Sequence, residues 1–187
     1  MSPLERFRLF FLAAMVALLA ACATPIDQAD QSISRIDALA RDIQQLSPTI
    51  GFEEAYAFAK VAVETSAELG RKYDVKLVPW LHNASVVVGM KDRGLCYEYA
   101  RDLYASLKFV DSRNLAMHFV QANRGKLNEH HALAVTVKGA EWSTGLVLDA
   151  WRGGGNLYSG PVGADKYPWL YERRDASFAN TAVAGPE

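Results

Sequence analysis

Residues 94–100, GLCYEYA, decide the fold because they mark the point where a loop turns into an amphipathic helix. From Cys96 to Leu107, apolar residues recur at three- and four-residue steps, which is the period of one helix face. The chain then changes to short segments rich in β-formers, separated by turn residues, at 115–122, 131–137 and 145–151. A helix followed by such strands predicts an α+β domain, with the helix packed on an antiparallel sheet.

Two more helices are expected before this segment. Residues 32–46 carry an apolar stripe, which Pro48 follows. Residues 52–69 carry another, with acidic residues in the first turn and Gly70 expected at the end. The chain has 187 residues, of which 50% are hydrophobic and 22% charged, as expected for one globular domain. Its formal net charge of −1 gives no sign of a nucleic-acid partner, which would usually require a basic excess.

The N-terminus predicts export. Residues 9–21 are uncharged and apolar, but a membrane span needs roughly 20 such residues, so the run suits the core of a signal peptide. The run ends in Leu-Ala-Ala before Cys22, which resembles the lipobox of bacterial lipoproteins. The resemblance implies cleavage before Cys22 and lipidation of that cysteine, and Ala23 after it implies sorting to the outer membrane, facing the periplasm. The alternative is an ordinary cleaved signal peptide with a chance cysteine.

These features divide the chain into four parts. The expected boundaries are a signal peptide at 1–21, the lipidated cysteine and a tether at 22–31, the α+β domain at 32–174, and a loose tail at 175–187. The chain has only two cysteines, so lipidation of Cys22 leaves Cys96 without a disulfide partner. A lone thiol in an oxidising compartment indicates either a functional nucleophile or a buried, inert side chain, and the count alone does not separate the two.

A nucleophilic cysteine needs a base within hydrogen-bond reach and a third group that orients the base. Alternation along the strand 131–137 places His131 on the bulky apolar face that should pack on the Cys96 helix, so His131 is preferred over its neighbour His130. Asp149 closes an apolar strand and needs a partner there, which a histidine on the neighbouring strand would supply. We therefore expect Cys96, His131 and Asp149 to converge, with a Cys96 pKa well below neutrality. His118 is expected to be an ordinary surface or packed histidine.

Two segments resemble the transglutaminase-like and papain-like cysteine peptidase superfamily. Residues 94–100 resemble its nucleophile segment, in which a glycine shortly precedes a cysteine that opens a helix, and residues 131–135, HALAV, resemble its histidine strand. Asp149 then completes the superfamily's Cys, His, Asp order. Leu133 replaces the usual aromatic residue, and the resemblance covers roughly residues 75–152. It implies a cysteine helix on an antiparallel sheet, with no metal and no organic cofactor.

The resemblance also implies a function and its alternatives. The leading hypothesis is a lipid-anchored thiol hydrolase, a peptidase or amidase that acts on a protein or peptide of the cell envelope through an acyl-enzyme. The fold does not select the reaction, so transglutaminase-type acyl transfer and a non-catalytic module that binds an envelope protein stay open. A side-chain N–H from Trp80 or Asn83 is a candidate to complete an oxyanion hole, although core packing of Trp80 is an equal alternative.

Overall fold

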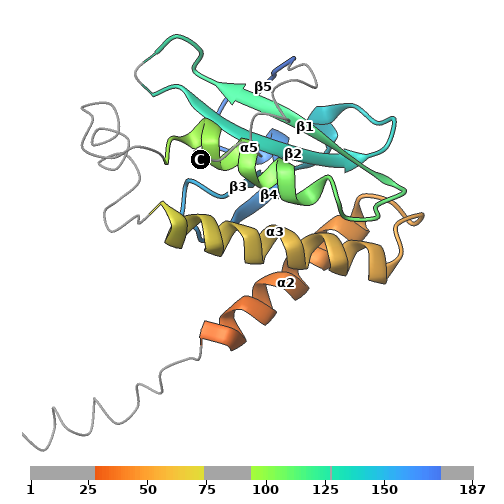
Figure 1. The fold of residues 1–187 in the computed structure, drawn as a ribbon. Helices are drawn as coiled ribbons and strands as arrows, with labels where there is room; N and C mark the ends of the chain where they lie inside the picture. The colour runs from red at the N-terminus through yellow and green to blue at the C-terminus, as the bar shows by residue number, and fades with distance from the viewer. Residues whose placement is uncertain (1–27, 74–93, 127, 174–187) are drawn as a thin grey trace, which may run out of the picture. The chain divides into compact units, whose positions relative to one another are not determined.

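The computed structural model describes residues 28–73, 94–126 and 128–173. Three helices lie in this part of the chain: α2 (Gln28–Gln45), α3 (Phe52–Lys72) and α5 (Cys96–Leu107). Helices α3 and α5 and most of α2 belong to the compact unit that begins at Ser32. Helix α5 packs against α3 and against the central strand of the sheet (Figure 1). Within the described residues, every helix is too short or too polar to cross a membrane.

Five strands form one antiparallel sheet. They are β1 (Leu115–Ala122), β2 (His130–Val137), β3 (Leu146–Asp149), β4 (Tyr158–Pro161) and β5 (Leu170–Tyr171), arranged in the order β4-β3-β2-β1-β5. The helices precede the strands, so the prediction of an α+β domain with an antiparallel sheet is confirmed. The predicted strands correspond to β1, β2 and β3. The short edge strands β4 and β5 were not predicted, because neither has the length or alternation that identifies a strand.

Each face of the sheet carries its own apolar cluster. The cluster on the helix side combines residues of the three helices with Leu133 and Val135 of β2 and Leu146 and Leu148 of β3. The cluster on the opposite side contains the alternate residues of the same strands, among them Ala132, Ala134 and Val147, together with Trp169 from the end of the chain. Both faces are therefore buried, and β2 and β3 are buried along nearly their whole length.

The end of α3 differs from the prediction. Gly70 does not stop the helix, which continues to Lys72. A Cβ atom at Gly70 would lie 2.6 Å from the carbonyl oxygen of Gly154 and 2.8 Å from the Cα of Gly155. The Ser66 hydroxyl donates a hydrogen bond of 2.9 Å to the carbonyl of Gly155 in the same contact. Gly70 is thus required for close packing of α3 on the turn that joins β3 to β4, rather than for a helix end.

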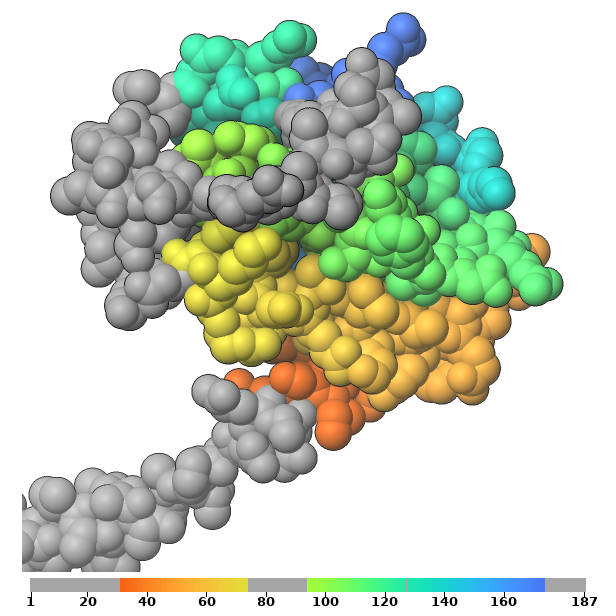
Figure 2. Space-filling model, viewed as in Figure 1, coloured from red at the N-terminus to blue at the C-terminus, as the bar shows by residue number. Residues whose placement is uncertain are grey.

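Helices α3 and α5 adjoin on the face of the molecule turned toward the viewer in Figure 2. The N-terminus of α5, the start of β2 and the end of β3 lie at the same end of the sheet. This end carries the candidate site.

Candidate active site

Cys96 is the first residue of α5, as the sequence predicts. The turn before it depends on Gly94, whose φ of 117° is one that side-chain-bearing residues rarely adopt. The carboxylate of Glu98 accepts hydrogen bonds from the backbone N–H groups of Gly94 (2.6 Å) and Leu95 (3.0 Å). Glu98 therefore fixes the loop that delivers Cys96 to the helix N-terminus, in the manner of one half of a capping box.

Glu98 and Asp102 lie outside the apolar stripe that the sequence predicts for this helix, but neither faces solvent. Both are buried, with 6% and 8% of their surface exposed. Asp102 accepts a hydrogen bond from the Tyr73 hydroxyl at 2.7 Å and pairs with Arg101. Each carboxylate has donors that compensate its burial, which a hydrophobicity pattern does not record.

The Cys96 thiol lies beside the first residues of β2. Its sulfur is 3.9 Å from the carbonyl oxygen of Glu129, to which the thiol donates a weak hydrogen bond. Burial raises the pKa of Cys96 to about 11, while the backbone N–H group of His131 lowers it and the negative charge of Asp149 raises it further. The prediction of a Cys96 pKa well below neutrality is therefore wrong, because desolvation of the thiolate outweighs the N–H donors at the helix N-terminus.

His130 and Asp149 form a buried pair. The Nε2 atom of His130 lies 2.6 Å from Oδ2 of Asp149, and only 2% and 1% of the two residues are exposed. Burial by itself raises the pKa of Asp149, but the hydrogen bond and charge of His130, together with Arg152, outweigh it and hold the pKa below its usual value. Asp149 is therefore ionised at neutral pH, and it accepts the Nε2 proton of His130.

The other nitrogen of this ring has no partner. Nδ1 of His130 is buried and makes no hydrogen bond to the described residues. Three aromatic rings surround the imidazole, with centroids 4.8 Å away for Trp151, 4.6 Å for Tyr167 and 5.4 Å for Trp169. With Nε2–H donated to Asp149, Nδ1 is the ring nitrogen left to act as a base, and no described residue binds it.

The prediction that His131 meets Asp149 is wrong. The His131 ring instead lies between two carboxylates, with Nε2 3.0 Å from Glu129 and Nδ1 3.0 Å from Glu172. It also makes an edge contact with the ring of Tyr97 in the first turn of α5, with ring centroids 6.4 Å apart. His131 thus faces the helices, as the strand alternation predicted, but that is not the face on which Asp149 lies.

The register of the sheet explains why His130, and not His131, binds Asp149. Leu133 pairs with Leu148 and Ala134 with Val147, so the even residues of β2 share a face with the odd residues of β3. His130 and Asp149 therefore lie on the face opposite the helices. His130 can still be reached from α5 because it is the first residue of β2, and the Cys96 sulfur contacts the carbonyl just before it. No hydrogen bond joins the Cys96 sulfur to the His130 ring in the described structure.

Several residues of the site were not predicted. Glu98, Tyr167, Trp169 and Arg152 were not identified as site residues from the sequence. The spacing of Glu98, three residues after the N-cap Leu95, is the one signal that identifies a capping carboxylate in the sequence. Tyr167 and Trp169 contact His130 only because the segment after β4 folds back over the sheet, whereas Arg152 lies three residues after Asp149 and binds it locally.

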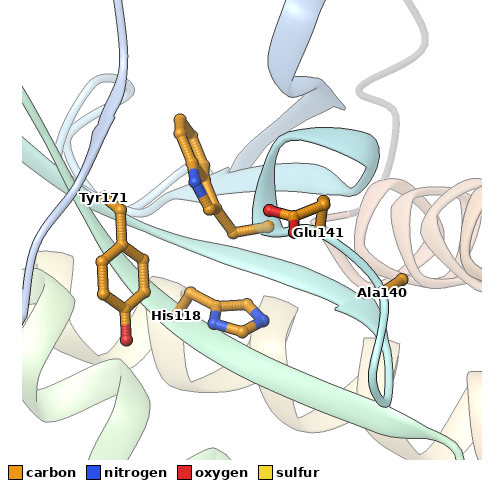
Figure 3. Close-up of a pocket in the computed structure, with 5 residues that line it drawn as sticks. His118, Ala140, Glu141 and Tyr171 are labelled. Carbon is orange, nitrogen blue, oxygen red and sulfur yellow. The ribbon is translucent and has the colours of Figure 1, made fainter.

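Other predicted site residues lie elsewhere. Trp80, Asn83 and Cys22 lie outside the described residues. His118 is half-buried on the outer face of the sheet, where its Nε2 lies 3.0 Å from the Thr136 hydroxyl oxygen and burial lowers its pKa. It lines a shallow pocket of about 410 Å³ together with Glu141, Trp142 and Tyr171, separate from Cys96 (Figure 3). Across the described ranges, no group of three or more His, Cys, Asp or Glu side chains is arranged to hold a metal ion.

Comparison with known proteins finds no matching protein family, no matching curated protein and no matching solved structure. The chemistry of the site therefore has to be argued from its own geometry.

Proposed function

We propose that this protein is a thiol hydrolase of amide bonds, with Cys96 as nucleophile, His130 as general base and Asp149 as the group that orients His130. The observation that carries the proposal is the buried His130–Asp149 pair, whose Nδ1 has no partner among the described residues, together with the Cys96 sulfur, which lies 3.9 Å from the carbonyl oxygen of Glu129, the residue before His130. A buried imidazole with one nitrogen fixed by a carboxylate and the other unoccupied is suited to proton transfer. The α+β fold with a cysteine at a helix N-terminus supports a papain-like or transglutaminase-like architecture.

The proton transfers follow from the tautomer of His130. The neutral thiol gives its proton to Nδ1 as the sulfur attacks the carbonyl carbon, so a carbon–sulfur bond forms and His130 becomes an imidazolium next to Asp149. The imidazolium then returns the proton to the departing amine as the carbon–nitrogen bond breaks. Water, deprotonated by the same nitrogen, hydrolyses the thioester and restores the thiol. Backbone N–H groups at the start of α5 are donors for the developing oxyanion.

This order of proton transfers is compatible with the high pKa of Cys96. A thiol with a pKa of about 11 does not form a stable thiolate at neutral pH, so the proton has to leave during attack rather than before it. The sulfur and Nδ1 are not hydrogen-bonded in this state, and catalytic contacts of this kind often tighten only when substrate binds.

The test is acylation of the full-length protein by 4-nitrophenyl acetate, followed by the burst of 4-nitrophenol and by mass spectrometry of the thioester. Wild type should be acylated at Cys96, and Cys96→Ala should not. His130→Ala should lose roughly 10²- to 10⁴-fold in rate, as expected for removal of a general base. His131→Ala is the matched control and should keep most of the rate.

The opposite result would remove the proposal. Retention of the wild-type rate by His130→Ala means that Cys96 reacts as an ordinary thiol. One observation favours a second function in that case, since a buried neutral thiol without a bonded base also fits a non-catalytic module that binds an envelope protein. Addition of a primary amine to the acylated protein distinguishes hydrolysis from acyl transfer. Comparison of periplasmic proteomes with and without Cys96→Ala then identifies the substrate.

A further inference from the structure

Arg152 joins the candidate site to a second carboxylate. Its Nε atom donates a 3.0 Å hydrogen bond to Oδ2 of Asp149, the same oxygen that binds His130. Its two terminal nitrogens form a fork with both oxygens of Asp165, at 3.0 Å and 2.6 Å. Arg152 therefore uses all three of its guanidinium nitrogens to bind two acids whose side chains are each only 1% exposed.

The guanidinium is also held from the side. It stacks over the ring of Tyr158 at 3.8 Å and lies 4.9 Å from the ring of Tyr167. Asp165 accepts a further hydrogen bond of 2.9 Å from the indole N–H of Trp169, which is one of the rings that enclose His130. Besides the pairing of Asp149 with Tyr158 in the sheet, this side chain connects Asp149 to the segment after β4.

Arg152 also contributes through its backbone. Its N–H group and that of Trp151 donate to Oδ1 of Asp149 at 3.0 Å and 3.1 Å. Asp149 thus accepts four hydrogen bonds, and the guanidinium is the donor that shares an oxygen with His130. Such a carboxylate has one rotational position in which all four donors are satisfied, and in that position Oδ2 receives the Nε2 proton of His130.

We propose that Arg152 is a positioning residue of the site, whose guanidinium, fixed by Asp165, holds Asp149 ionised and in the one orientation that presents Nδ1 of His130 as the free base. The proposal rests on the proposed function. Arg152 does not touch the reacting atoms, and it acts through Asp149. Its second role is to make the orientation of Asp149 depend on the segment that carries Asp165, Tyr167 and Trp169.

The charge balance at Asp149 gives the expected sign of the pH effect. Its titratable neighbours are His130 of β2, Arg152 after β3, Tyr158 of β4, Asp165 and Tyr167 after η2 (Val162–Ala164), and the thiol of Cys96 at the start of α5. Arg152 is the permanent cation among them. Its removal leaves Asp149 and Asp165 buried and close together without a shared positive charge, so Asp149 should accept a proton at higher pH.

The experiment is the pH profile of Cys96 acylation by 4-nitrophenyl acetate in the full-length protein. Arg152→Gln should move the acid limb of the profile upward by about one pH unit or more, because a neighbouring cation lowers a carboxyl pKa by roughly 1–3 units. Arg152→Lys keeps the charge but loses the fork, so its acid limb should stay near that of wild type while its plateau rate falls. Arg101→Gln is the matched control, because Arg101 is also paired with a buried aspartate, Asp102, away from His130.

Each outcome has a distinct meaning. The positioning role is overturned if the acid limb of Arg152→Gln coincides with that of wild type. It is also overturned if the rate of Arg152→Gln falls by the same factor at every pH, like that of Arg101→Gln. Either result leaves Arg152 with a structural role. If Arg152→Gln does not fold, an acid limb of Arg152→Lys shifted by a unit or more overturns the role of the charge. Failure of the proposed function has another signature, a wild-type rate in His130→Ala, which leaves Arg152 with nothing to position and overturns the inference as well.

Discussion

At the scale of single residues, the chemistry of the site depends on which groups are buried together. Desolvation dominates at Cys96 and keeps the thiol neutral, whereas at Asp149 the donors outweigh desolvation and keep the carboxylate charged. Cys96 and Asp149 therefore differ in protonation because they differ in how many hydrogen-bond donors compensate their burial. A neutral thiol needs proton transfer during attack, which places the demand for precise geometry on His130.

The pKa of Cys96 predicts how stability changes at alkaline pH. The folded-state pKa of about 11 is above that of the unfolded thiol, so the neutral thiol contributes stability that is complete below the unfolded pKa and lost as pH rises toward about 11. Between these values wild type should lose up to about 1.4 kcal/mol of unfolding free energy per pH unit more than Cys96→Ala. Urea denaturation of both proteins, at about pH 8 and about pH 10, measures the difference. Parallel losses in the two proteins would show that the buried thiol ionises as readily as an unfolded one.

At the scale of secondary-structure elements, the site is positioned by contacts between a helix and a turn. Helix α3 packs through Gly70 and Ser66 on Gly154 and Gly155, in the turn that also carries Trp151 and Arg152. The backbone N–H groups of those last two residues bind Asp149. A displacement of this turn should therefore reach the carboxylate.

Gly70→Ala tests this connection. The new methyl group would meet backbone atoms at 2.6 Å and 2.8 Å, which must move apart. Alanine is favoured in a helix by about 1 kcal/mol, but overpacking against rigid atoms costs about 1–3 kcal/mol, so a net loss of stability is expected. Thermal unfolding gives that loss, and the acylation rate of Cys96 should fall with it.

Gly163→Ala is the control for this substitution, since nothing lies within 4 Å of its Cβ position. It should change the free energy of unfolding by no more than about 0.5 kcal/mol. A Gly70→Ala protein with wild-type stability and an unchanged acylation rate would mean that the turn and Asp149 are not connected in this way.

At the scale of the whole molecule, the sheet is covered on both faces, and the candidate site lies at the end where β2 begins and β3 ends. The location proposed for this domain is the periplasmic side of the outer membrane, through a lipid on Cys22. The sequence before Cys22 supports this proposal, because its apolar run is short and ends in Leu-Ala-Ala.

Cys22→Ser tests the proposed anchor. Wild-type protein should incorporate a labelled fatty-acid analogue and pellet with membranes, while Cys22→Ser should do neither, because the thiol accepts the first lipid. Cys96→Ser is the matched control, and it should be labelled like wild type. Incorporation of label by Cys22→Ser would show that the lipobox interpretation is wrong.

The sequence by itself determined the α+β class, the start of α5 at Cys96, the three longer strands and the need of Asp149 for a histidine partner, because these depend on local periodicity and on the cost of burying a charge. It also placed His131 correctly on the helix side of β2. The choice of histidine required the tertiary structure. Leu146, Val147, Leu148 and Asp149 are all buried, so β3 has no polar alternation that would reveal which of its residues share a face with His130. Arg152 binds Asp149 three residues before it, but Asp165, Tyr167 and Trp169 reach this cluster only because the residues after β4 fold over the sheet. No local pattern encodes such contacts.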